Sequence, residues 1–227
     1  MMIRVKFGKE GALRFIGHLD VLRTFQKIFR RAGIPMVYSQ GFSPHPIMSF
    51  ALPLGLGLSS EGEYLDAEIE EMDPAQILPR LRGATSEDLP VYGVRILPEK
   101  AGNAMASVGR ASYRVEIRTD QREIMGQAAA RLMEQEQLII EKKTKSQTLE
   151  MDLRPCLYQL RAEVRPGETP FLFMELAAGS KANIKPEIVW EELWRGIAEE
   201  APAPLSIRRL DLMQEDGTSL GDLGEMC

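Results

Sequence analysis

The sequence predicts the same order of strands and helices twice, once in each half of the chain. In the first half, apolar residues alternate over residues 3–7, which predicts a strand. Apolar residues at helical spacing over 19–32 predict a helix that ends at Gly33 and Pro35. The same kinds of signal then predict extended segments at 36–38, 47–52 and 62–70, a short helix from Asp73-Pro74, and a strand at 91–97.

The second half repeats this order. A strand is predicted at 113–118, and Asp120 with Glu123 forms the sequence signature of a capping box for a helix that runs to Glu136. Extended segments follow within 138–152, with a turn near Ser146. The remaining elements are strands at 157–164 and 171–176, a helix from Pro186 and a strand at 205–212.

Strand, helix, strand, strand, helix, strand is the order of the ferredoxin-like unit, in which two helices cover one face of an antiparallel sheet. We therefore expect an α+β protein of two tandem ferredoxin-like (β-α-β-β-α-β) units with mostly antiparallel sheets and an extra hairpin in the second. The expected boundaries are 1–98 for the first unit, 99–112 for a linker, 113–213 for the second unit and 214–227 for a flexible tail. A single larger α+β domain is the alternative.

Composition narrows the class of protein. No apolar stretch approaches the ~18–20 residues of a membrane span, and Arg4 and Lys6 lie where a signal peptide would be apolar. The two cysteines, Cys156 and Cys227, cannot form a disulfide framework or a four-cysteine metal site within one chain. We expect a reduced, cytoplasmic protein that binds no membrane, no metal and no cofactor.

Charge is distributed unevenly along the chain. The net charge is −5, but the first fifty residues are basic and contain only two acids, Glu10 and Asp20. On the predicted first helix, one stripe carries Asp20, Arg23, Lys27, Arg30 and Arg31. Such a stripe is either a solvated helix face or a phosphate-binding surface, and the sequence leaves both interpretations open.

The two histidines are the candidate catalytic residues. His18 begins the predicted helix and His45 lies between two prolines, and histidine is suited to proton transfer near neutral pH. Both also fit purely structural roles. The same loop contains Gln40, Gly41, Phe42 and Ser43, which suit contact with a phosphate and a base but equally suit a plain turn.

Several longer motifs carry a family resemblance. They are LRFIGHLD at 13–20, RRAGIP at 30–35, YSQGFSPHP at 38–46, SFALPLG at 49–55, DLRP at 152–155 and LAAGS at 176–180. Together they resemble the bacterial radical-SAM-associated proteins, a domain of unknown function found alone or fused behind a radical SAM enzyme. The resemblance implies a radical SAM protein as partner. Since this chain lacks the clustered cysteines that hold an iron–sulfur cluster, any radical reaction would belong to that partner.

A looser resemblance points to an enzyme. Tandem ferredoxin-like units are similar to the repeat-processing endoribonucleases of CRISPR systems, some of which use a histidine in the first helix, where His18 stands. Their C-terminal glycine-rich signature is absent, because residues 217–224 have a different, acidic pattern.

Three hypotheses follow. The leading one is a non-catalytic accessory of a radical SAM enzyme that binds RNA through a site comprising Arg14, His18, Asp20, Arg23, Lys27, Arg30, Arg31, Gln40, Gly41, Phe42, Ser43 and His45. The second is a metal-independent endoribonuclease with His18, alone or together with His45, as acid and base; the sequence does not establish that the two histidines are adjacent. The third is a protein-interaction scaffold that binds no nucleic acid.

Overall fold

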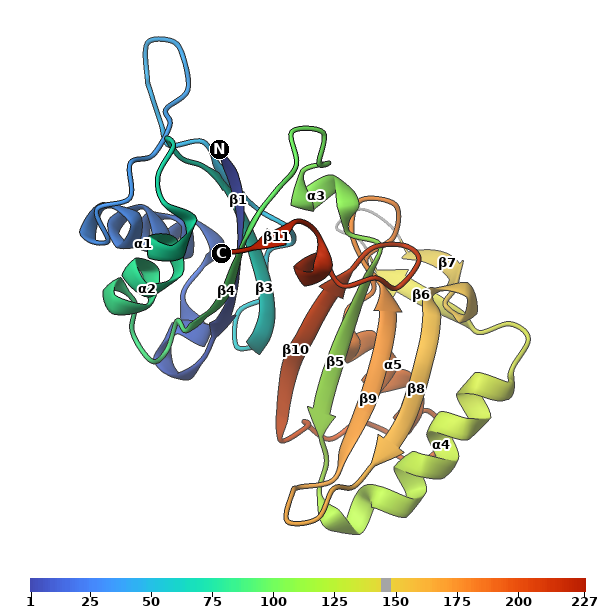
Figure 1. Cartoon of the computed structure of the whole chain (residues 1–227). Coiled ribbons are helices and arrows are strands. Elements are labelled where there is room, and N and C mark those ends of the chain that lie inside the picture. The colour runs from blue at the N-terminus through green and yellow to red at the C-terminus, as the bar shows by residue number, and fades with distance from the viewer. Residues whose placement is uncertain (144–147) are drawn as a thin grey trace. The chain divides into compact units, whose positions relative to one another are not determined.

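The computed structural model describes residues 1–143 and 148–227 and contains two compact units (Figure 1). The first unit comprises residues 1–109 and 209–227, and the second comprises residues 110–208. Among the described residues, no helix combines the length and apolar character needed to cross a bilayer.

The first unit has the predicted order of elements. These are β1 (Met2–Lys9), α1 (His18–Arg31), β2 (Met48–Phe50), β3 (Ser59–Glu68), α2 (Pro74–Ala84) and β4 (Val91–Ile96), with the 3-10 turn η1 (Gly11–Phe15) after β1. The strands lie in the order β4-β1-β3-β2, and every pair is antiparallel. This is the ferredoxin-like topology, so the predicted fold class is confirmed. The extended segment expected at 36–38 contributes isolated bridges instead of a strand.

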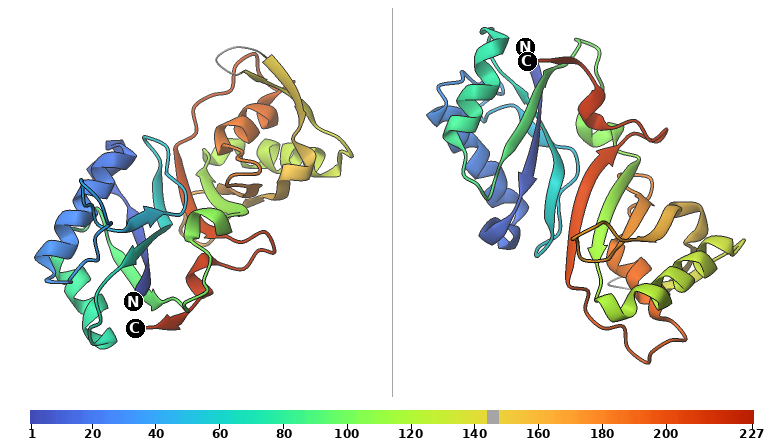
Figure 2. Two further views of the ribbon diagram at one scale, coloured as in Figure 1. Left: turned by 90° about the horizontal axis from the view of Figure 1, so that it is seen from above. Right: turned by 60° about the horizontal axis from the view of Figure 1, so that its bottom comes forward.

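Both helices of this unit lie on one face of its sheet (Figure 2). From α1, the side chains of Val21, Phe25, Ile28 and Phe29 are buried against Ile3, Val5 and Phe7 of β1 and against α2. Leu19 was expected in this apolar stripe but is 61% exposed. The reason is helical geometry, since two positions correspond to about 200° of rotation and Leu19 therefore points away from Val21.

The ends of the first unit differ from the predicted linker and tail. The linker range contains α3 (Ala104–Ser107), capped by Asn103, and β5 already begins at Arg110. The tail range contains η4 (Leu220–Asp222) and β11 (Glu225–Met226), which pairs with β4. Leu220 is fully buried, so burial of an apolar side chain holds this segment in place despite its glycine-rich, acidic composition.

The second unit repeats the topology. Its elements are β5 (Arg110–Glu116), η2 (Thr119–Gln121), α4 (Arg122–Glu134), β6 (Ile139–Lys143), β7 (Thr148–Asp152), η3 (Arg154–Cys156), β8 (Leu157–Glu163), β9 (Phe171–Ala177), α5 (Pro186–Trp194) and the start of β10 (Ser206–Met213). The strand order is β10-β5-β9-β8, with β9 antiparallel to β5 and β8. The extra hairpin is β6-β7. Its predicted turn near Ser146 lies outside the described residues.

Candidate nucleic-acid interface

A groove of about 720 Å³ lies between α1 and the chain that follows it. Four side chains of α1 form one wall, and the opposite wall comes from the backbone turn and the start of the next loop. The lining residues are Arg23, Gln26, Lys27, Arg30, Gly33, Ile34, Pro35, Met36, Tyr38 and Pro46.

The turn at the end of α1 creates the second wall. Gly33 adopts a left-handed conformation with φ +63°, and the Ile34 N–H donates to the Phe29 carbonyl. This is the geometry of a Schellman C-cap, which reverses the chain direction. Ile34 is buried in the core, while the N–H groups of Val37 and Glu70 bond to the carbonyls of Glu68 and Pro35. The reversed chain is therefore fixed beside α1.

The groove is cationic. Arg23, Lys27 and Arg30 recur at positions i, i+4 and i+7 of α1, so they share one face of the helix. Arg23 forms an exposed ion pair with Asp20 at 3.2 Å. The side chains of Lys27 and Arg30 form no hydrogen bond or ion pair with any residue in the described part of the chain, and no carboxylate is among the lining residues. The groove thus holds two cations whose charge is not neutralised internally.

The loop beyond the groove projects from the first unit (Figure 1). Hydrogen bonds between Ser39 and His45 join the two ends of this loop. Ser39 Oγ lies 2.9 Å from His45 Nδ1 and accepts the His45 N–H at 3.1 Å. The Ser39 N–H donates to the His45 carbonyl at 2.9 Å. Two aromatic side chains are left accessible, Tyr38 at the groove with 52% exposure and Phe42 at the tip, fully exposed.

A comparison with protein families assigns the chain to one of them. The model described as "Uncharacterized protein conserved in bacteria (DUF2344)" matches residues 2–186. The chain belongs to this family. The description of this family specifies neither an activity nor a partner. A comparison with curated proteins gives no match.

Among solved structures, the chain is similar to one titled "Crystal Structure of a Cbf5-Nop10-Gar1 Complex". The identity is 11%, the TM-score is 0.49, and the match covers 94% of this chain. It covers 50% of the other chain, so the present chain spans half the length of that protein.

The sequence-predicted site residues of this DUF2344 chain are only partly brought together. Arg23, Lys27 and Arg30 share the groove, and Asp20 pairs with Arg23 beside it. Arg31 lines a separate hollow near α2, and Arg14 lies in η1 with its guanidinium 4.7 Å from the Phe15 ring. The residues at the exposed loop tip do not line the groove; they are Gln40, Gly41, Phe42 and Ser43.

The two histidines line different hollows. His45 borders a hollow of about 310 Å³ that Asp66 and Asn103 also line. His18 borders a cavity of about 20 Å³, where its ring packs 5.2 Å from that of Phe50. An acid and base acting on one bond must both reach it, and the structure does not bring these two side chains to a common hollow.

The cavity beside His18 has an unusual electrostatic environment. Lys9 is almost fully buried there and donates to the Ile16 carbonyl at 2.9 Å. Burial lowers the pKa of Lys9, the negative charge of Glu63 raises it, and the positive charge of Arg209 lowers it further. Glu63 itself forms a buried ion pair with Arg209. The volume corresponds to about one water molecule, which excludes a nucleotide.

Sequence reasoning missed part of the groove. Gln26 lies one turn from Arg23 and Arg30, and a helical projection of polar as well as charged residues would have found it. Tyr38 was quoted in a motif but not named as a contact. Ile34, Pro35 and Met36 carry no polar signal, because they form the wall through the course of the backbone after Gly33.

Proposed function

We propose that the chain is a non-catalytic RNA-binding protein that holds a strand with unpaired bases in the groove beside α1. One observation carries the proposal: Arg23, Lys27 and Arg30 line the same groove as the exposed Tyr38, and two of these cations lack an internal partner. Cations that track the backbone and an aromatic ring that stacks on a base are the combination used by proteins that bind single strands.

The acidic net charge of the chain does not oppose this proposal. Association with a polyanion responds to the local potential, and the groove lining contains basic side chains without acidic ones. Asp20, the nearest acid of α1 in sequence, is engaged by Arg23. The other two cations would exchange mobile counterions for phosphates, which is favourable and strongly dependent on salt.

The geometry favours binding over cleavage. His45 bonds with Ser39 at the base of its loop, and His18 borders a cavity that is too small for a nucleotide. No single described hollow offers both side chains to one phosphodiester. A nuclease activity is therefore not part of the proposal.

The test is the salt dependence of binding to a fluorescent oligouridylate, measured by anisotropy. Each phosphate contact with a single strand adds about 0.7 to the slope of log affinity against log salt, so the two contacts of Lys27 and Arg30 weaken binding about 7-fold between about 50 and 200 mM salt. We expect the triple variant Arg23→Ala/Lys27→Ala/Arg30→Ala to lose this dependence and most of the affinity.

A matched control variant removes three positive charges at exposed positions outside the groove. Lys100, Arg122 and Lys185 are exposed, and their replacement by alanine should leave the affinity and the slope unchanged. Equal behaviour of the two triple variants would contradict the proposal, and so would the absence of measurable binding by the native chain. In the second case the scaffold hypothesis would become the better explanation.

We also propose that this RNA-binding protein acts beside a radical SAM enzyme. The support is the resemblance of its motifs to radical-SAM-associated proteins, together with a count of only two cysteines, which cannot supply the three that hold a radical SAM cluster. The expected result is co-purification of the native chain and such an enzyme from one bacterium, retained after nuclease treatment. Failure of the purified pair to associate with or without RNA would remove the partner but not the RNA-binding proposal.

A further inference from the structure

A second cationic hollow lies where α1 and α2 end. It has a volume of about 420 Å³ and is lined by Arg31, Ala32, Arg80, Gly83, Ala84 and Thr85. Arg80 was not among the predicted site residues. The two arginines come from different helices, so the pairing of α1 with α2 creates the hollow.

Each arginine crosses to the other segment. Arg31 Nη2 donates to the Ala84 carbonyl at 2.8 Å, and Arg80 Nη1 donates to the Gly33 carbonyl at 3.3 Å. Arg80 also donates to the Gln76 side chain. A guanidinium has five N–H donors, so each group retains free donors. Within the described part of the chain neither arginine forms an ion pair, and no carboxylate lines the hollow.

The hollow and the groove share no lining residue, but a hydrogen bond to Gly33 connects them. This residue lines the groove, and its carbonyl accepts the hydrogen bond from Arg80, which lines the hollow. On the other side, Arg30 of the groove and Arg31 of the hollow are consecutive residues of α1. The cations of both sites therefore follow one another around the end of α1.

We infer that a bound RNA strand continues from the groove into this hollow, where Arg31 and Arg80 bind a further backbone phosphate. The inference rests on the proposed function and adds a second subsite, with Arg80 as a binding residue. Planar guanidinium groups with free donors are well suited to phosphate oxygens.

A purely structural role would also explain the two arginines. Carbonyl groups at helix C-termini attract cations, and Arg31 and Arg80 bond to such carbonyls. Removing either arginine would disturb these contacts, so a better perturbation changes the charge of the hollow and leaves both arginines in place.

Gly83 offers that perturbation. It lies in α2, and a Cβ added there meets no atom within 4 Å. Gly83→Glu introduces a negative charge beside the two arginines, while Gly83→Gln matches its size without the charge. Gly83→Ala reports the effect of the backbone change alone and should be tolerated, since alanine favours a helix.

The experiment compares a short oligouridylate of about 4 nucleotides with a long one of about 16, which span the usual site sizes of single-strand binding folds. One phosphate contact with a slope of about 0.7 corresponds to about 5-fold in affinity at 0.1 M salt. We expect Gly83→Glu to bind the long RNA at least about 5-fold more weakly than Gly83→Gln, with a slope lower by about 0.7. Both variants should bind the short RNA as the native chain does.

The outcomes separate the two proposals. If Gly83→Glu and Gly83→Gln bind the long RNA equally while the groove triple variant binds weakly, the subsite is wrong and the proposed function stands. If Gly83→Glu weakens both lengths equally, the effect is long-range repulsion and the subsite is again wrong. If the native chain binds neither RNA, both proposals fail together.

Discussion

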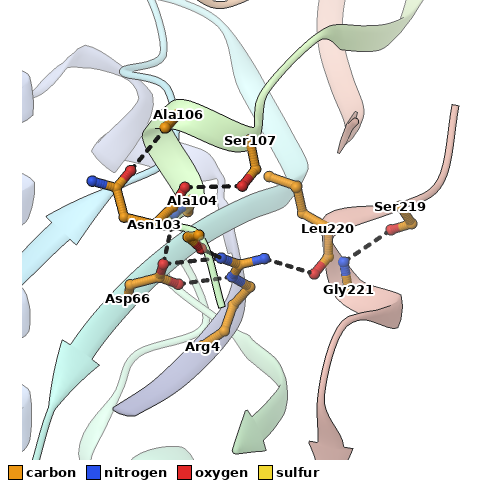
Figure 3. Close-up of polar contacts among 10 residues, drawn as sticks. Arg4, Asp66, Asn103, Ala104, Ala106, Ser107, Ser219, Leu220 and Gly221 are labelled. Atoms are coloured by element: carbon orange, nitrogen blue, oxygen red, sulfur yellow. Dashed lines mark hydrogen bonds and ion pairs between the residues drawn. The ribbon is translucent and has the colours of Figure 1, made fainter. Parts of the chain in front are cut away.

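Replacing Asp66 by alanine should destabilise the first unit strongly, because it leaves a buried arginine without its counter-charge. In the native chain, Arg4 Nε and Nη2 donate to the two carboxylate oxygens of Asp66 at 2.7 and 2.9 Å (Figure 3). The side chains are 1% and 5% exposed. The guanidinium of Arg4 is thus shielded from solvent in the native chain, and removal of the carboxylate leaves its charge without the partner that compensates its burial.

The contacts of Arg4 and Asp66 determine how much stability the variant should lose. Asp66 also accepts the Ala104 N–H at 2.7 Å, and Arg4 donates to the carbonyls of Leu220 and Gly102 at 3.3 and 3.5 Å. Breaking a buried ion pair by removing one partner costs about 3–5 kcal/mol. We expect the upper part of that range for Asp66→Ala, since the N–H at the start of α3 loses its acceptor as well.

The assay is urea unfolding followed by circular dichroism, combined with hydrogen exchange of residues 101–107 and 219–222. The double variant Arg4→Met/Asp66→Leu removes both charges, so it should recover part of the stability that Asp66→Ala loses. It should not recover all of it, because the backbone groups of Ala104 and Leu220 remain without these partners. A loss below about 1 kcal/mol in Asp66→Ala, or a double variant less stable than the single one, would refute the reasoning.

Two further predictions concern other residues. Burial and the neighbouring Asp211 carboxylate raise the pKa of Tyr64. The folded chain therefore retains a proton that the unfolded chain releases near pH 10, and its stability should fall as the pH rises above this value. The midpoint of urea unfolding should fall less over this pH range in Tyr64→Phe than in the native chain. Tyr38→Leu should weaken RNA binding by about 1–3 kcal/mol through loss of base stacking, whereas Tyr38→Phe should retain the native affinity. If an anisotropy titration gives the same affinity for Tyr38→Leu and Tyr38→Phe, stacking at this position is excluded.

Local patterns were sufficient to predict the fold. The apolar spacing from Leu19 to Ala32 and the stop at Gly33 predict α1, and Asp73 predicts the start of α2, where its side chain accepts the Ala75 N–H. Alternating residues predicted most strands. Repetition of the order then implied the topology, because a ferredoxin-like unit has few ways to bury two helices on one sheet.

Contacts between residues that are far apart in the chain could not be predicted from sequence patterns. Leu220 is buried although its segment has a composition typical of a flexible tail, and its carbonyl accepts a hydrogen bond from Arg4, more than two hundred positions away. A pattern within one segment contains no information about such a contact. The same limit explains why residues 99–112 were predicted as a linker although Ala104 is buried.

The candidate site was predicted in part for the same reason. Helical spacing is local, so the cationic face of Arg23, Lys27 and Arg30 could be read directly. The assignment of Arg31 to another hollow depends on its packing beside α2, and Arg80 becomes relevant only because it reaches the Gly33 carbonyl. Likewise, no pattern in the sequence placed His18 and His45 in different hollows.

The most direct measurement is photo-crosslinking of the native chain to thiouridine-substituted RNA, with the crosslinked residues mapped by mass spectrometry. RNA held beside α1 should crosslink within residues 23–46, above all at Tyr38 and Phe42, whose rings are exposed at the groove and at the loop tip. The crosslinks should disappear in the Arg23→Ala/Lys27→Ala/Arg30→Ala variant. Crosslinks confined to residues 110–208, or unchanged in that variant, would contradict the proposed interface.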